Sequence, residues 1–92
     1  MKSKNILKLI DGNFTPAEAG SVLFALISTK INYHSMEAFS IKERTNGDVS
    51  KSENRIQELK ITAKGLKEII DLANERQYNL KIKGTIEINF IK

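Results

Sequence analysis

Apolar residues recur in alternating steps of three and four along the second half of the chain, and this spacing constrains the fold more than any other feature. The residues concerned are Ile56, Leu59, Ala63, Leu66, Ile70 and Ala73. The pattern is a heptad seam and predicts a helix with one buried stripe. The helix is expected to begin at a capping box, Ser50-Lys-Ser-Glu53, and to reach Gln77, which makes it roughly 39 Å long.

A helix of this length is large for a chain of 92 residues. A compact globule of that size has a radius of gyration of only about 12 Å. The helix is therefore expected to span the whole molecule or to overhang it.

A second helix is predicted upstream, in the stretch IDGNFTPAEAGSVLFALIS (residues 10–28). Thr15 is its expected N-cap, Pro16 suits the first helical position, and Glu18 completes a capping box. The helix is expected to run to about Tyr33. Its apolar residues cover an arc of roughly 200°, which is wider than the face that an ordinary surface helix buries. This helix must therefore be covered on two sides.

The two ends of the chain are predicted to be strands. In NILKLIDG, Leu7 and Leu9 are expected on one face and Ile6, Lys8 and Ile10 on the other. In NLKIKGTIEINFIK, apolar and polar residues alternate from Leu80 to Phe90, which predicts one buried and one solvated face. Gly84 lies on the apolar face and indicates a bulge or a close helix contact.

The segment from His34 to Ser50 allows two interpretations. Phe39 and Ile41 alternate before a turn signal, Asn46-Gly47, which is typical of a short edge strand. The same residues are also consistent with a mobile loop anchored by two apolar side chains.

These elements predict a single α+β domain over residues 1–92, with the order β-α-(short β or loop)-α-β. Two long helices are expected to pack on one face of a small, mainly antiparallel sheet, with the last strand paired to the first. Such a sheet is small and leaves its edges unpaired. We expect a homodimer that completes the core or extends the sheet, because the sheet is small, the apolar arc of the first helix is wide and the second helix is long.

Composition limits the function classes. The chain has no Cys, so it can have neither a disulfide framework nor a thiolate metal site. Its longest apolar run, VLFALI at residues 22–27, is far shorter than the roughly 20 residues of a membrane span. The N-terminal apolar stretch is too short for a signal peptide and is interrupted by Lys8. A cytoplasmic protein is expected.

The turn before the first helix resembles a phosphate-binding loop but is interpreted as a structural turn. Such loops cluster their glycines, whereas Gly12 and Gly20 are eight residues apart and no Lys follows. Thr15 is expected to use the free backbone donors itself, and Asp11 and Glu18 add negative charge. Neither a bound cofactor nor a phosphate is expected here.

Other candidate chemistry is sparse, and no catalytic, cofactor-binding or metal-binding residue is assigned. His34 is the only histidine and is expected at a helix C-terminus, where an imidazolium suits the dipole. Ser35 is adjacent to it in sequence, which is not triad geometry. Glu58-Leu59-Lys60 matches part of a nuclease pattern but is predicted to lie on a helix. No metal-binding motif is present, and an enzyme is not expected.

The formal net charge of +4 indicates a basic surface. Lys8, Lys81 and Lys83 are expected to share the open sheet face, and Lys60, Lys64 and Lys67 the outer face of the long helix. Positive fields favour phosphate backbones, so these are candidate nucleic-acid contacts. Acidic residues interrupt the helical stripe, however, and the sheet face offers no aromatic residue for base stacking.

Self-association is the leading functional expectation. Ile61 and Leu72 lie opposite the heptad seam and flank Gly65, whose missing side chain would let another backbone approach. The wide arc of the first helix adds Phe24 and Ile31. The expected function is that of a small, non-enzymatic interaction or regulatory protein acting as a homodimer. The alternative is a nucleic-acid-binding accessory protein that uses its lysines.

Three stretches carry a resemblance to known proteins: IDGNFTPAEA after the first strand, KINYH at a helix end and RIQEL opening the long helix. In these stretches the chain resembles short bacterial proteins of the Bacteroidetes type, which have no assigned activity. The resemblance implies a bacterial, cytoplasmic origin and carries over no functional residue.

Overall fold

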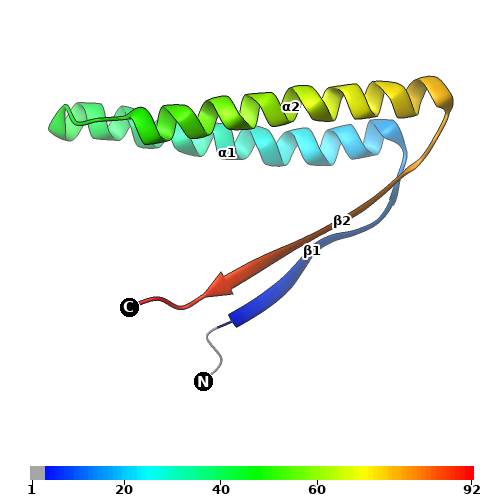
Figure 1. Ribbon diagram of the computed structural model, residues 1–92, viewed down its shortest axis with the longest axis horizontal. Coiled ribbons are helices and arrows are strands. Elements are labelled where there is room, and N and C mark those ends of the chain that lie inside the picture. Colours follow the sequence, from blue (N-terminus) through cyan, green and yellow to red (C-terminus); the bar gives the residue numbers. More distant parts are fainter. Residues whose placement is uncertain (1–3) are drawn as a thin grey trace.

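The computed structural model describes residues 4–92, which form an α+β domain. The elements follow in the order β1 (Lys4–Phe14), α1 (Pro16–Thr45), α2 (Ser50–Arg76) and β2 (Leu80–Asn89). The helices form an antiparallel hairpin, and the strands pair as a two-stranded antiparallel ribbon on which the hairpin packs at one end (Figure 1). The predicted fold class and the pairing of the last strand with the first are confirmed.

The hairpin is held together by two matching apolar stripes. All six predicted seam residues of α2 are buried or half-buried, and Leu59 has only 8% of its surface exposed. The facing stripe of α1 also advances in steps of three and four. It consists of Gly20, Phe24, Ile27, Ile31, His34, Ala38 and Ile41, all half-buried. Heptad spacing on both helices keeps the two stripes in register along the whole hairpin.

Residues 34–45 continue α1, so both interpretations of the segment from His34 to Ser50 are wrong. The spacing of His34, Ala38 and Ile41 extends the helical stripe, and no Pro or Gly interrupts the chain before Gly47. Packing against α2 therefore outweighs the short alternation of Phe39 and Ile41. The helix ends at Asn46, which takes the left-handed conformation and donates its N–H to the carbonyl of Lys42.

The two helix starts differ from each other. At α1 the predicted capping box is present: the N–H of Glu18 donates to Thr15 Oγ1 (3.2 Å) and the N–H of Thr15 donates to Glu18 Oε1 (2.9 Å). At α2 the predicted capping box is wrong. Val49 is the N-cap and makes no side-chain cap, while the Asp48 carboxylate accepts the N–H of Ser50 (2.9 Å).

The ribbon contains a bulge that changes which residues share a face. The register is interrupted between Lys8 and Ile10, so Leu9 is the extra residue. Leu7 pairs with Ile86 and Ile10 pairs with Gly84, which places both on the apolar face of β2. The prediction that Leu7 and Leu9 share one face, opposite Ile10, is therefore wrong, because a regular period of two does not survive a bulge.

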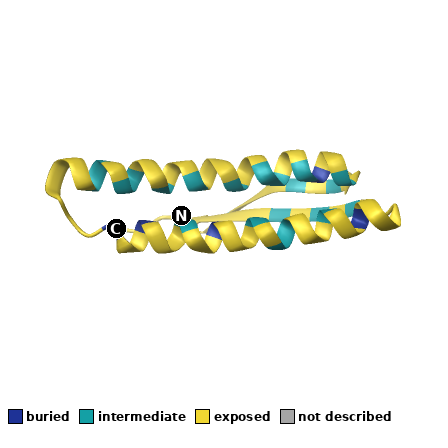
Figure 2. Ribbon diagram, turned by 90° about the horizontal axis from the view of Figure 1, so that it is seen from above, coloured by how far each residue is buried: buried dark blue, intermediate teal, exposed yellow. Residues whose placement is uncertain are grey.

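Little of this molecule is buried. Its extents are 50 × 37 × 15 Å and its radius of gyration is 16.8 Å, against about 12 Å for a compact chain of this length. Among the described residues the buried apolar ones are Ala19, Val49, Leu59 and Ala73, and no large side chain is fully buried. Figure 2 accordingly shows buried positions only as isolated patches. Within residues 4–92, neither helix is long and apolar enough to cross a membrane.

Candidate functional site

The turn between β1 and α1 uses its own hydrogen-bonding groups. The capping box occupies the N–H groups of Thr15 and Glu18, and Pro16 has none to offer. The backbone N–H of Thr15 and then its side chain hold the pKa of Glu18 below its usual value, so a negative charge stays at the helix start. Asp11 lies on the ribbon and pairs with Lys8 (3.4 Å). This arrangement supports the structural interpretation of the turn.

A polar cluster joins the two helices near the inter-helix loop. The buried Ser52 hydroxyl of α2 donates to Glu37 Oε1 of α1 (2.7 Å), and His34 Nδ1 lies 3.4 Å from the same oxygen. The hydrogen bond from Ser52, followed by that from His34, lowers the pKa of Glu37. The carboxylate therefore stands between the serine and the histidine. In a nucleophilic triad the histidine occupies the middle position, so this order does not activate Ser52.

The ring of His34 lies on the stripe that faces α2, and its side chain is 14% exposed. Its Nε2 atom is buried and has no hydrogen-bond partner among residues 4–92. Such a polar atom costs free energy unless it is paired.

Replacing His34 by Leu is therefore expected to raise the free energy of unfolding by about 1 kcal/mol, since it removes the unpaired nitrogen and keeps an apolar side chain on the stripe. Urea unfolding at neutral pH measures the change. Asn32→Leu, at an exposed position of the same helix, is the control and should change little. A lower stability of His34→Leu would show that the contact of Nδ1 with Glu37 outweighs the cost of the unpaired Nε2 atom.

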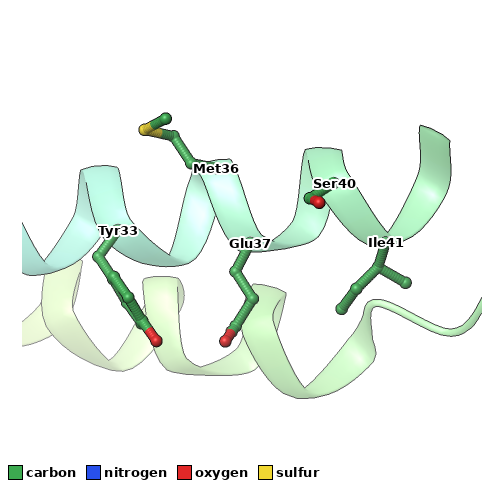
Figure 3. A pocket seen from close by; sticks show the side chains of 5 residues that line it. All are labelled: Tyr33, Met36, Glu37, Ser40 and Ile41. Carbon is green, nitrogen blue, oxygen red and sulfur yellow. The ribbon is translucent and has the colours of Figure 1, made fainter. Parts of the chain in front are cut away.

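A surface depression of about 440 Å³ lies beside the same part of α1. Its lining residues are Tyr33, Met36, Glu37, Ser40 and Ile41. All five come from one helix, and in Figure 3 Tyr33, Glu37 and Ile41 point to one side of it while Met36 points to the other. The depression is thus open and offers no enclosed place for a substrate.

A second cavity, of about 620 Å³, is lined by charged and polar residues of both helices. They are Tyr33, His34, Glu37, Lys51, Asn54, Arg55 and Glu58. Arg55 and Glu58 pair with each other at 2.8 Å. Asp11, the acidic residue before the first helix, does not line this cavity. It lines a separate depression on the ribbon. Within residues 4–92 the structure holds no group of three His, Cys, Asp or Glu residues that could bind a metal.

The lysines of the two predicted clusters lie on the surface. Lys8 pairs across the ribbon with Thr85, and Lys81 and Lys83 point to the same side of β2 as Thr85. Asp11 lies on the same face, opposite Lys83. On α2, Lys60, Lys64 and Lys67 are exposed, but Lys67 is paired with Asp71 (2.6 Å), which raises its pKa.

A third site is apolar. A groove of about 520 Å³ runs between α1 and α2 on one broad side of the hairpin. Its lining residues are Leu23, Leu26, Ile27, Thr62, Gly65, Leu66 and Ile69. None of them is charged, and a Cβ atom built on Gly65 would meet nothing within 4 Å. This groove is where the hairpin can receive another apolar surface.

The residues predicted for self-association divide into two groups. Ile61 and Leu72 are exposed and Gly65 is open, as a contact surface requires. Phe24 and Ile31 are half-buried on the stripe that faces α2, so much of their apolar surface is already used within the chain.

The sequence interpretation missed Leu23, Leu26 and Ile69 as candidate contacts. Leu23 and Leu26 belong to the 200° arc of α1, and Ile69 widens the seam of α2. The signal that could have identified them is their position on the same side of both helices, which becomes visible only once the helices are known to be antiparallel.

Comparison of the chain with protein-family models, with curated proteins and with solved structures gives no match.

Proposed function

We propose that this chain is a small, non-enzymatic interaction protein that works as a homodimer. The observation that carries the proposal is its accessible surface of 7621 Å². A folded monomer of 10.4 kDa is expected to expose only about 5,400 Å². The excess is about 2,200 Å² per chain, and two chains hiding it would bury about 4,400 Å², which is the range of obligate dimers.

The kind of surface supports the same proposal. Exposed large apolar side chains occur on both helices and on both strands, among them Leu26, Met36, Ile61 and Ile86. Scattered apolar residues are common on protein surfaces, but contiguous apolar patches mark interaction sites. The proposal places the protein in the cytoplasm, in keeping with its cysteine-free sequence.

Sedimentation equilibrium over a dilution series, at low and high salt, tests this function. The expected result is a dimer at micromolar concentration whose dissociation constant changes little with salt, because the contact is apolar. A chain that stays monomeric throughout would contradict the proposal.

A second candidate function is nucleic-acid binding, and one observation favours it. Lys81 and Lys83 stand on the polar face of the ribbon, on the same side as Lys8, and a two-stranded ribbon is an element that fits the major groove of DNA. Lys4 and Lys8 on this face are paired with Glu87 and Asp11, which lowers the positive charge available to phosphates. For this reason it ranks second.

For the second candidate, the expected result is that a DNA duplex of about 20 base pairs binds less tightly as salt rises, with at least about a tenfold loss for Lys81→Glu with Lys83→Glu. Fluorescence anisotropy measures both effects. Lys60→Glu with Lys64→Glu, on α2, is the charge-matched control and separates the ribbon from general basicity. Equal losses of affinity for the two pairs of variants would exclude the ribbon as the nucleic-acid-binding element. So would an unmodified chain that does not bind DNA.

A further inference from the structure

The ribbon packs on the hairpin only at one end, here called the hinge, and leaves apolar residues such as Leu7 and Ile86 exposed beyond it. The space between the exposed part of the ribbon and the hairpin is here called the wedge. Both strands leave the same end of the hairpin, and the ribbon diverges from the helices toward its free ends (Figure 1). Seen from above, the ribbon lies between the lines of the two helices, so it stands opposite a broad side of the hairpin (Figure 2). Beyond the hinge the strands stay exposed. Their exposed apolar residues include Leu7, Ile86 and Ile88.

Ala19 identifies the hairpin side that faces the ribbon. It precedes the stripe residue Gly20 by one position and therefore points about 100° away from α2. Ala19 is nevertheless completely buried, with 0% exposure. The strand ends at the hinge are the remaining structure that can cover it. Leu23 and Leu26 follow Ala19 by one and two helical turns, so the side that carries the apolar groove is the one turned toward the ribbon.

The ribbon turns its apolar face to the same wedge. Leu80, Ile82 and Gly84 alternate along β2 and are half-buried near the hinge, whereas the intervening Lys81 and Lys83 are exposed. Ile86 and Ile88 continue this face toward the free end of the ribbon, where both side chains are exposed. The apolar face therefore begins against the hairpin and runs into solvent as the wedge opens.

We propose that a second copy of this chain occupies the wedge, so that the groove residues Leu23, Leu26 and Ile69 and the ribbon residues Leu7 and Ile86 are buried in the dimer. This inference rests on the proposed homodimer and assigns its interface. The wedge exposes apolar residues of the hairpin and of the ribbon together, so a partner there can hide part of the excess surface of about 2,200 Å² per chain from both.

The chemistry of the wedge favours a second copy over a different partner. Each chain carries a formal charge of +4, yet no groove residue is charged. Two like-charged chains can therefore bury the groove residues without burying a charge of the groove. An acidic partner would instead gain most from the basic surfaces outside the wedge. A twofold axis also brings the same apolar residues together from both copies.

The test compares Leu26→Asp with Ile69→Asp, made together, against Phe39→Asp. Phe39 is an exposed apolar residue of the same helix, and its position, thirteen residues after Leu26, turns it about 140° away from the groove. In sedimentation equilibrium the double variant is expected to raise the dissociation constant at least about 100-fold, and the control to change it less than about threefold. Circular dichroism checks that each variant keeps its helices.

A second measurement holds even where the aspartates disturb folding. The chain has no Cys, so Ile69→Cys and Phe39→Cys each place one thiol at a chosen position. Alkylation of Ile69→Cys is expected to slow at least about tenfold above the dissociation constant, while Phe39→Cys reacts at the same rate at all protein concentrations.

The outcomes separate this inference from the function on which it rests. If the unmodified chain is monomeric, the proposed homodimer and the assignment of its interface to the wedge both fail. If it is dimeric but the double variant stays dimeric and Ile69→Cys is not protected, the wedge is not the interface and the dimer forms elsewhere. Loss of the dimer with protection at Ile69→Cys supports both.

Discussion

Leu59→Ala is expected to lower the free energy of unfolding by about 2–3 kcal/mol. Among residues 4–92, Leu59 is one of the few large side chains that are almost fully buried, and it lies in the middle of the stripe of α2. Truncation removes buried methyl groups and leaves a cavity, which together cost about 2–5 kcal/mol for a core Leu. The lower end applies here because a slender hairpin relaxes into the space more readily than a thick core.

The variant is informative because this effect is large relative to the total free energy of unfolding. A domain of this length has a free energy of unfolding on the order of 5–10 kcal/mol, so the change removes a large share of it. Urea or thermal unfolding followed by circular dichroism measures the difference. Lys60→Ala, at the exposed neighbouring position, should stay within about 0.5 kcal/mol of the unmodified chain. Equal effects at residues 59 and 60 would mean that the two helices do not pack along this stripe.

Gly20→Leu is expected to lower the free energy of unfolding by about 1–3 kcal/mol, through overpacking. Gly20 lies on the stripe of α1, and a Cβ atom placed there would stand 3.4 Å from Ile70 Cδ1 and 3.6 Å from the ring of Phe24. A single methyl group fits at these distances, but a branched side chain does not. The helices would have to separate or the side chains to leave their preferred rotamers.

Gly20→Ala is the matched control, and its expected effect has the opposite sign. Its Cβ makes ordinary contacts with Ile70 and Phe24, and Ala in a helix interior is favoured over Gly by roughly 0.5–1 kcal/mol. The same unfolding experiment measures both variants. If Leu were tolerated as well as Ala at residue 20, the close approach of α1 to α2 at this end of the hairpin would be wrong.

Local signals predicted the helices well where several agreed. Thr15, Pro16 and Glu18 identify the start of α1 because capping depends on residues within one turn. The heptad of α2 identifies both its extent and its buried stripe, because the spacing of apolar residues is a property of the chain itself. At Ser50 the same reasoning failed, since Asp48 competes for the N–H of Ser50 and takes it.

The segment after Tyr33 shows the limit of short windows. Phe39 and Ile41 alternate like strand residues within a short window, and only a longer window shows that His34, Ala38 and Ile41 keep a helical spacing. The preference arises from α2, against which His34, Ala38 and Ile41 continue a stripe that begins at Gly20. A contact between residues far apart in sequence therefore decides the local conformation.

The same division applies to the candidate sites. The sequence placed Lys8, Lys81 and Lys83 on one face, because alternation along paired strands follows from the period of two. It could not place Leu23 and Leu26 beside Ile69, since that depends on the antiparallel order and the rotation of two helices. Gly84 indicated a bulge, and the register shift lies opposite it, but the sequence could not show that the extra residue is Leu9 of the other strand, which brings Leu7 and Ile10 to one face.

The sequence by itself determined the element types, the order of strands and helices, and the seam along α2, because hydrogen bonding within a helix, capping and residue spacing act over a few residues. The tertiary structure alone decided how far α1 extends and which apolar side chains remain uncovered. Those features depend on which surfaces meet, and in this chain the hairpin and the ribbon meet at only one end. The apolar surface that they leave open is therefore a property of the arrangement and not of any single element.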